Sequence, residues 1–290
     1  MEIRLIRHAT LLLTFHGRRL LVDPMLADAG TAPPIANSPN PRPNPLVPLP
    51  VPAGDVVAGV DAVLVTHTHR DHWDDAASAA LPKALPLFCQ PEDEAKFRDA
   101  GFTEVRPVRG VAHWDGIAIH RTGGQHGSGE LARRLAPVSG FVLRAGGASL
   151  ARAAGPDAAG GPAPDGAADE PVLYIAGDTI WCADVEEALR EYDPAVTVLN
   201  AGGAQFLEGG PITMTAEDVA AVARAAPSTR IVAVHMESIN HCVVRRADLA
   251  AALERAGLTP RVAIPGDGEH VPAGPPRPAQ PRPRRPAKSG

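Results

Sequence analysis

The segment "LVTHTHRDHWDD" at residues 64–75 places three histidines and three aspartates directly after the apolar run "VDAVLV". Two interpretations compete: a solvated polar loop with chance histidines, or the first half of a metal site. His67 and His69 stand two apart where an extended strand ends, so both side chains point to the same side and can meet one ion. Asp71 and His72 follow as the chain turns and can serve a second ion. Because composition alone produces HxHxDH in about one chain in a thousand of this length, the pattern favours the metal site.

Composition and charge limit the partners of the chain. It has 290 residues, 44% of them hydrophobic, and a net charge of −5, which suits one large or two small globular domains. Residues 271–290 carry four Arg, one Lys and no acid, so the rest of the chain has 23 basic against 33 acidic residues. We expect a disordered, basic, Pro-rich tail and an acidic body, which argues against nucleic acid as a partner.

The cysteines and the apolar runs bear on location. Cys89, Cys182 and Cys242 lie far apart without a CxxC pair, which fits a reducing compartment. The N-terminus has neither a long apolar core nor a small-residue cleavage site, and no run approaches 18 apolar residues. We therefore expect a cytoplasmic protein without stable membrane insertion. Oligomeric state cannot be read from these features.

Two low-complexity segments interrupt an alternating pattern of strands and helices. Residues 2–23 are expected to form two strands with a hairpin turn at 16–19. Residues 27–52 hold nine prolines and predict a loop over the surface that could rim a site, and residues 145–170, with 10 Ala and 6 Gly, predict a surface insert. Further strands are predicted within 60–66, 86–90, 103–108, 117–122, 139–145, 171–179, 195–202 and 229–236, and helices within 74–81, 91–101, 184–192, 215–227 and 246–257. Strands that first cluster and then alternate with helices predict a layered, mixed α/β domain.

The HxHxDH pattern after a buried strand resembles that of the metallo-β-lactamase superfamily. The order of the later motifs is also similar: "IAIHRTGGQHGSG" offers His126, "LYIAGDT" offers Asp178 and "IVAVHMES" offers His235. The opening "HATLLL…G…LLVDP" resembles the UlaG-like branch of Zn-dependent hydrolases, which includes an ascorbate-phosphate lactonase. The resemblance covers about residues 1–270. It implies a hydrolase domain over that range with a four-layer αββα sandwich, in which helices flank two mixed sheets.

The resemblance also implies a dinuclear metal site. One divalent ion would be held by three histidines and the other by an aspartate and two histidines, with a second aspartate bridging: His67, His69 and His126; Asp71, His72 and His235; Asp178. Imidazole and carboxylate donors suit Zn²⁺ best, with Mn and Fe as alternatives. Ions about 3.5–4 Å apart share a hydroxide that can attack a small soluble ester, lactone or phosphodiester. Asp71 would also orient the nucleophile or accept a proton.

Several histidines keep open roles. His241 follows the last ligand and is interpreted either as a hydrogen-bond donor beside the ligands or as the acid for the leaving group, with an ordinary loop histidine as the alternative. His8, in "RHAT", belongs to the opening motif and stands between a structural role and a place at the metal edge. Three further histidines are expected to be structural or surface residues: His16, His113 and His120.

Other functions require features that the sequence lacks. A nuclease of the RNA-processing branch needs a basic face or an added binding arm, and a membrane phospholipase needs an amphipathic apolar segment. A non-catalytic metal sensor would have a broken ligand set, whereas all seven expected positions are filled. The sequence therefore predicts a metallohydrolase of a small-molecule substrate whose identity depends on the shape of its pocket.

Overall fold

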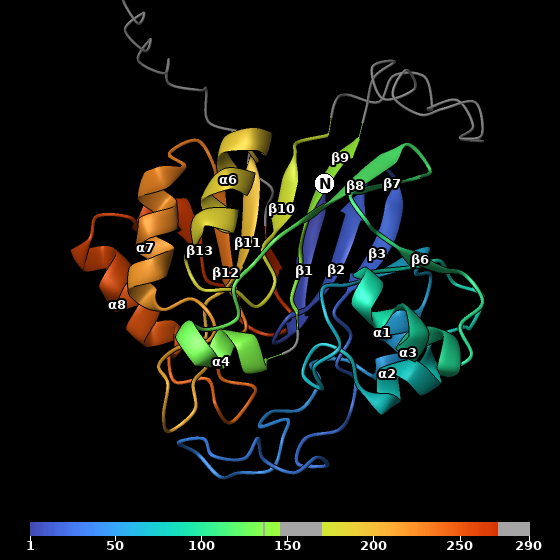
Figure 1. The fold of residues 1–290 in the computed structure, drawn as a ribbon, viewed down its shortest axis with the longest axis horizontal. Coiled ribbons are helices and arrows are strands. Elements are labelled where there is room, and N and C mark those ends of the chain that lie inside the picture. The colour runs from blue at the N-terminus through green and yellow to red at the C-terminus, as the bar shows by residue number, and fades with distance from the viewer. Residues whose placement is uncertain (136, 146–169, 272–290) are drawn as a thin grey trace, which may run out of the picture.

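A computed structural model describes residues 1–135, 137–145 and 170–271 of the chain (Figure 1). Two seven-stranded sheets face each other, and helices cover the outer face of each. The predicted α/β architecture of two mixed sheets flanked by helices is confirmed. The expectations for the 145–170 insert and the 271–290 tail concern segments that lie almost entirely outside the described residues.

The first sheet combines an antiparallel and a parallel part. Its strands are β1 (Glu2–Arg7), β2 (Thr10–Phe15), β3 (Arg18–Val22), β4 (Ala62–Val65), β5 (Leu87–Cys89), β6 (Val105–Pro107) and β14 (His270–Val271). They lie in the order β14-β1-β2-β3-β4-β5-β6, and pairing is parallel from β3 onwards. On this side of the molecule lie α1 (Ala53–Val57), α2 (Asp75–Ala80) and α3 (Glu94–Asp99), the last preceded by a 3₁₀ turn at Pro91–Asp93.

The second sheet holds the other half of the chain. Its strands are β7 (Val111–Trp114), β8 (Ile117–Thr122), β9 (Gly140–Ala145), β10 (Leu173–Ile175), β11 (Val196–Asn200), β12 (Arg230–Val234) and β13 (Val262–Ala263), in the order β13-β12-β11-β10-β9-β8-β7. The helices of this half are α4 (Gly129–Arg134), α6 (Ala183–Tyr192), α7 (Ala216–Ala225) and α8 (Arg246–Arg255), and a 3₁₀ turn spans Thr259–Arg261. Thr215 and Asp218 form a capping box at the start of α7, in which each side chain accepts a hydrogen bond from the other residue's backbone N–H.

The alternation of side chains along β2 shows how the layers form. Leu11, Leu13 and Phe15 pack into the core between the sheets, whereas Leu12 points to the other face, into the cluster beneath α1, α2 and α3. This is the two-residue period of a strand that is buried on both faces. Each fully buried side chain of this size contributes about 2 kcal/mol of hydrophobic stabilisation. The two sheets and their helices thereby become a rigid frame for the loops at one edge.

The opening segment differs from its prediction. Residues 2–23 form three strands rather than two, because a turn at His8–Ala9 separates β1 from β2. The hairpin turn expected at 16–19 is present between β2 and β3. At the first turn the backbone of His8 is left-handed, with φ 61°. A non-glycine residue in that conformation carries no turn signature in its sequence, so the dense apolar run concealed the break.

Other differences concern short elements. The sequence did not predict β7, β13, β14, α1 or α4, which have two to six residues each and show too little periodicity to be recognised. The Pro-rich loop, residues 27–52, contains no helix or strand, as predicted; an isolated bridge joins Ala32 to Asn44. Among the described residues, no helix is long and apolar enough to cross a membrane.

Candidate metal centre

The functional side chains are carried by loops that leave the strands at one edge of the sandwich. His67, His69, Asp71 and His72 follow β4, and His126 follows β8. Asp178 and His235 follow β10 and β12, two strands that flank β11 in parallel pairing. Because parallel strands end at the same edge, residues far apart in the sequence meet there. The structure brings all seven predicted ligands together in this way.

One group of four residues could hold an ion on its own. The ligand atoms of His67, His69, His126 and Asp178 all lie within 4.8 Å of one another. The His67 Nε2 atom is 2.9 Å from His69 Nδ1, and the Oδ2 atom of Asp178 is 3.8 Å from His67 Nε2 and 4.0 Å from His126 Nε2. Three imidazoles and one carboxylate are a donor set that suits Zn²⁺.

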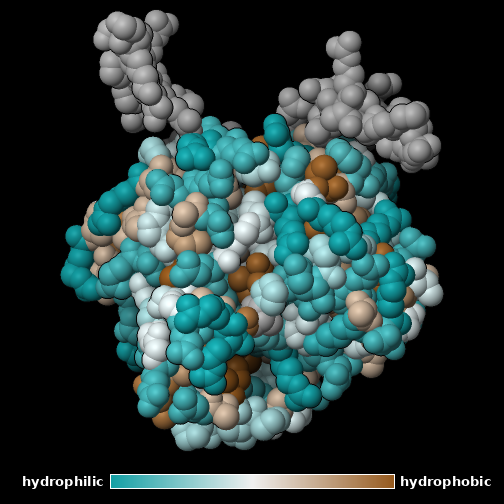
Figure 2. All heavy atoms as spheres, viewed as in Figure 1, coloured by the Kyte–Doolittle hydropathy of each residue, from teal (hydrophilic) through white to brown (hydrophobic). Residues whose placement is uncertain are grey.

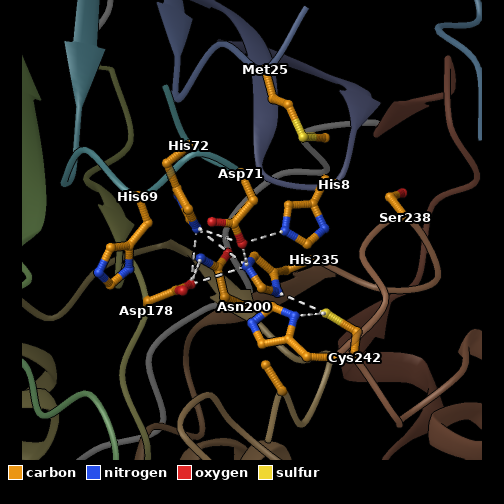
Figure 3. A network of polar contacts seen from close by, with 12 residues as sticks. His8, Met25, His69, Asp71, His72, Asp178, Asn200, His235, Ser238 and Cys242 are labelled. Carbon is orange, nitrogen blue, oxygen red and sulfur yellow. Dashed lines mark hydrogen bonds and ion pairs between the residues drawn. The ribbon is translucent and has the colours of Figure 1, made fainter. Parts of the chain in front are cut away.

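The second group consists of Asp71, His72, His235 and His8 (Figure 3). The Nε2 atoms of His72 and His235 are 3.2 Å apart, and Asp71 Oδ2 is 3.8 Å and 3.5 Å from them. Asp178 Oδ1 lies 3.3 Å and 3.2 Å from the same two nitrogens. Tetrahedral Zn²⁺ with bonds of 2.0–2.1 Å needs donors about 3.3 Å apart, which is close to these five separations.

The carboxylate of Asp178 lies between the two groups. Its Oδ1 atom faces His72 and His235, and its Oδ2 atom faces His67 and His126. The side-chain amide of Asn200, at the end of β11, donates a hydrogen bond of 2.7 Å to Oδ1 and fixes the rotation of the carboxylate. Asn200 was not predicted as a site residue, since an asparagine at a strand end is common and carries no metal signal.

Hydrogen bonds behind the histidines set which nitrogen faces the centre. Asp23 Oδ2 lies 2.8 Å from His72 Nδ1, and Asp23 is itself held by the backbone and hydroxyl of Thr66, each at 2.7 Å. His126 Nδ1 lies 2.9 Å from the carbonyl oxygen of Ile212. Such partners leave Nε2 free for an ion and usually matter for metal affinity. Sequence reasoning missed Asp23, although its place in the opening "LLVDP" motif was a signal.

Charge is unevenly distributed over the centre. Burial alone would raise the pKa of Asp71 and Asp178, but the neighbouring imidazoles hold each pKa well below its usual range. Burial would lower the pKa of His72, but Asp178 and Asp23 raise it well above the usual value. In the metal-free protein at neutral pH, His72 therefore carries a proton between ionised carboxylates. Metal uptake should release that proton, since a ligating imidazole is neutral.

Acid should destabilise the metal-free protein through His126. Burial lowers the pKa of His126 to about 4, from an ordinary value near 6.5. As the pH falls between these values, the unfolded chain binds a proton that the folded chain refuses, so stability falls with pH. From pH 7.5 to 4.5 this group alone should remove about 2–3 kcal/mol from the free energy of unfolding.

Urea denaturation of chelator-treated protein measures this effect. The matched variant is His126→Asn, whose side-chain amide can still donate to Ile212 but does not titrate. We expect the stability of the variant to depend less steeply on pH than that of the wild type over this range. Equal pH dependence of the two proteins would show that His126 does not resist protonation in the fold.

Five other histidines have roles predicted or left open by the sequence, and only one of them joins a group of possible ligands. His8 belongs to the second group, with its Nε2 atom 3.2 Å from Asp71 Oδ2. His241 is buried but lies in neither group; its Nδ1 atom is 4.0 Å from the sulfur of Cys242, which in turn lies 3.6 Å from His235 Nδ1. Among the described residues, the three histidines expected to be structural also stay outside both groups: His16, His113 and His120.

Comparison with known proteins identifies the family. A family model described as the beta-lactamase superfamily domain matches residues 18–236, three quarters of the chain. The chain belongs to the metallo-β-lactamase-fold hydrolases. The UPF0173 protein YddR of Bacillus subtilis is 35% identical over 275 residues, which cover 93% of this chain and 98% of that protein. The resemblance to the family predicted from the motifs is thus confirmed, whereas membership of the UlaG-like branch stays a prediction.

Two solved structures are similar along nearly their whole length. The isothiocyanate hydrolase from Delia radicum gut bacteria shares 39% identity with a TM-score of 0.82, over 94% of this chain and 99% of that one. A protein described as a possible metal-dependent hydrolase, from Veillonella parvula, shares 35% identity with a TM-score of 0.83, over 93% and 98%. With the two histidine and aspartate groups, these relatives show that the chain is a metal-dependent hydrolase.

Proposed function

We propose that the chain is a dinuclear metallohydrolase that acts on a small soluble electrophile. The observation that carries the proposal is the carboxylate of Asp178, whose two oxygens face two separate groups of donors. When bound there, two divalent ions such as Zn²⁺ would lower the pKa of a shared water to about 7 and so supply a nucleophile at neutral pH. The ligand assignments follow the two groups, with Asp178 in both: His67, His69 and His126; Asp71, His72 and His235.

The remaining proton transfers are assigned to the chain's own side chains. Asp71 lies at the centre as an ionised carboxylate and can orient the attacking water or take up its proton. His241 is proposed as the acid that protonates the leaving group, because it is buried near the ligands without belonging to either group. A general acid outside the coordination sphere keeps a nitrogen available for the substrate.

The substrate class is proposed from the relatives and from the apolar residues near His126. An isothiocyanate has a carbon between nitrogen and sulfur that a hydroxide can attack, and a relative with 39% identity hydrolyses isothiocyanates. Close to His126, whose Nδ1 atom contacts the carbonyl oxygen of Ile212, the side chain of Ile212 lies beside Gly127. Gly209 lies against Leu131 of α4, and Leu207 is 64% exposed. Figure 2 shows hydrophobic residues in the hollow beside α4. Such walls favour an apolar substituent over a charged one.

A parallel substrate assay tests this function. Purified protein is loaded with Zn²⁺, analysed for metal content, and assayed with an aryl or alkyl isothiocyanate, a lactone and a phosphodiester. We expect two ions per chain and turnover of the isothiocyanate above the other two. His69→Ala should lose both turnover and one ion. Turnover of the lactone or phosphodiester alone would overturn the substrate class, and full activity of His69→Ala would overturn the metal mechanism.

A further inference from the structure

His8 stands out as a buried residue in an unfavourable backbone conformation. It forms the turn between β1 and β2 with φ 61°, and its side chain is fully buried. His235, one of the proposed ligands, is also left-handed, with φ 69°. The left-handed conformation costs an L-residue roughly 1–2 kcal/mol, and such strain persists where the surrounding structure requires it. In this protein the left-handed backbone of the two residues places their imidazoles, which come from different sheets, next to each other.

The side chain of His8 contacts two of the proposed ligands (Figure 3). Its Nε2 atom lies 3.2 Å from Asp71 Oδ2. Its ring lies over the ring of His235, with centroids 3.6 Å apart and an interplanar angle of 36°. The backbone N–H of His235 also donates a 2.9 Å hydrogen bond to the carbonyl oxygen of His8. His8 therefore joins the first sheet to the last ligand of the second sheet.

These contacts distinguish a supporting role from that of an eighth ligand. An ionised carboxylate only accepts hydrogen bonds, so the Nε2 atom of His8 must carry the proton and donate it to Asp71. A protonated nitrogen has no lone pair for a metal. The ring of His8 also lies tilted over the ring of His235, whereas His72 and His235 turn their Nε2 atoms toward each other at 3.2 Å. The Nδ1 atom of His8 has no hydrogen-bond partner in the described structure.

We propose that His8 is a positioning residue of the second metal site, which fixes Asp71 by a hydrogen bond and His235 by ring packing. This inference rests on the proposed dinuclear function. The donated proton occupies one lone pair of Asp71 Oδ2 and leaves another for an ion, which this oxygen would hold together with His235 Nε2, 3.5 Å away from it. Without His8, Asp71 can rotate and the face of His235 loses its support.

Two variants of matched size separate the hydrogen bond from simple packing. His8→Leu fills the space without a donor, and His8→Gln places an amide N–H near the position of Nε2. Both keep a Cβ atom in the left-handed turn and keep the carbonyl that His235 uses, so their backbone strain is comparable. Zn²⁺ binding is measured by competition with a chromophoric chelator, which resolves the two equivalents. The thermal unfolding of the metal-free variants is recorded alongside.

We expect His8→Leu to weaken the second equivalent of Zn²⁺ by about 10–100-fold, the effect usual for a residue that supports a ligand. The first equivalent should bind as in the wild type, and His8→Gln should recover most of the lost affinity. Wild-type binding of both equivalents by His8→Leu would overturn the proposal, as would equal weakening of both equivalents, which indicates a general loss of structure. Uptake of a single equivalent by the wild type would refute the dinuclear function itself, and the His8 proposal with it.

Discussion

Replacement of Asp178 by asparagine is expected to lower kcat/KM by at least about a thousandfold, because the variant removes the charge that both metal positions share. The carboxylate is buried and lies within 4.0 Å of imidazole nitrogens on both sides. Asparagine has nearly the same shape, but its amide NH2 group would replace one of the two carboxylate oxygens that now face imidazole nitrogens. Less negative charge would then lie between two ions that repel each other, so we also expect the variant to bind fewer than two equivalents of Zn²⁺.

The matched control for this experiment is Asp184→Asn, the same chemical change at an exposed position in the first turn of α6. It should keep wild-type metal content and turnover. Metal content is measured on the dialysed proteins and activity with the substrate that the wild type turns over fastest. If Asp178→Asn retained two ions and turnover within tenfold of the wild type, a bridging role for this carboxylate would be excluded.

The ligands could be found in the sequence because each sits where a regular element ends. His67 and His69 follow a buried β-branched strand, and Asp178 and His235 each follow another, so the edge at which they meet follows from the pairing of parallel strands. The family resemblance supplied the order of the motifs. The metallo-β-lactamase fold and the convergence of the seven side chains were therefore predictable before any coordinates.

The supporting residues could not be found in this way. Asp23, Asn200 and His8 act through contacts with residues 22 to 227 positions away, so neither a strand-end asparagine nor the opening motif that holds His8 and Asp23 shows what these side chains contact. The turn at His8 was also hidden by the prediction of two strands where three exist. Its turn depends on a left-handed backbone that only tertiary contacts stabilise, so propensity and periodicity gave no sign of it.

The Pro-rich loop, residues 27–52, illustrates how a segment without regular structure can still be ordered. Its main attachment is Asn240, a buried residue in the loop that follows His235. The Oδ1 atom of Asn240 accepts hydrogen bonds from Ile35 N and Asn44 Nδ2, and its Nδ2 atom donates to the loop at Ser38 Oγ and two carbonyls. The side-chain amide of this one residue thereby holds a loop in which the prolines have no backbone N–H group for a regular hydrogen-bond ladder.

Substitution of Asn240 by alanine should therefore release the loop from the site. Several buried donors and acceptors would lose their partners at once, and we expect the free energy of unfolding to fall by about 2–5 kcal/mol. The loop also bonds to a segment beside a proposed ligand, since Leu46 N donates to Ser238 O, three residues after His235, and Leu207 N donates to Asn37 O. If the loop forms part of the substrate wall, KM should rise more than kcat falls, because the loop contributes no proposed ligand.

Urea denaturation, metal analysis and steady-state kinetics together test this expectation. Asn40→Ala is the matched control, because Asn40 offers Asn240 only its backbone carbonyl, which alanine retains. The control should keep the stability and KM of the wild type, and both variants should keep their metal content. If Asn240→Ala lost metal as readily as a ligand variant, the loop would be supporting the metal positions themselves, and its place as a substrate wall would have to be abandoned.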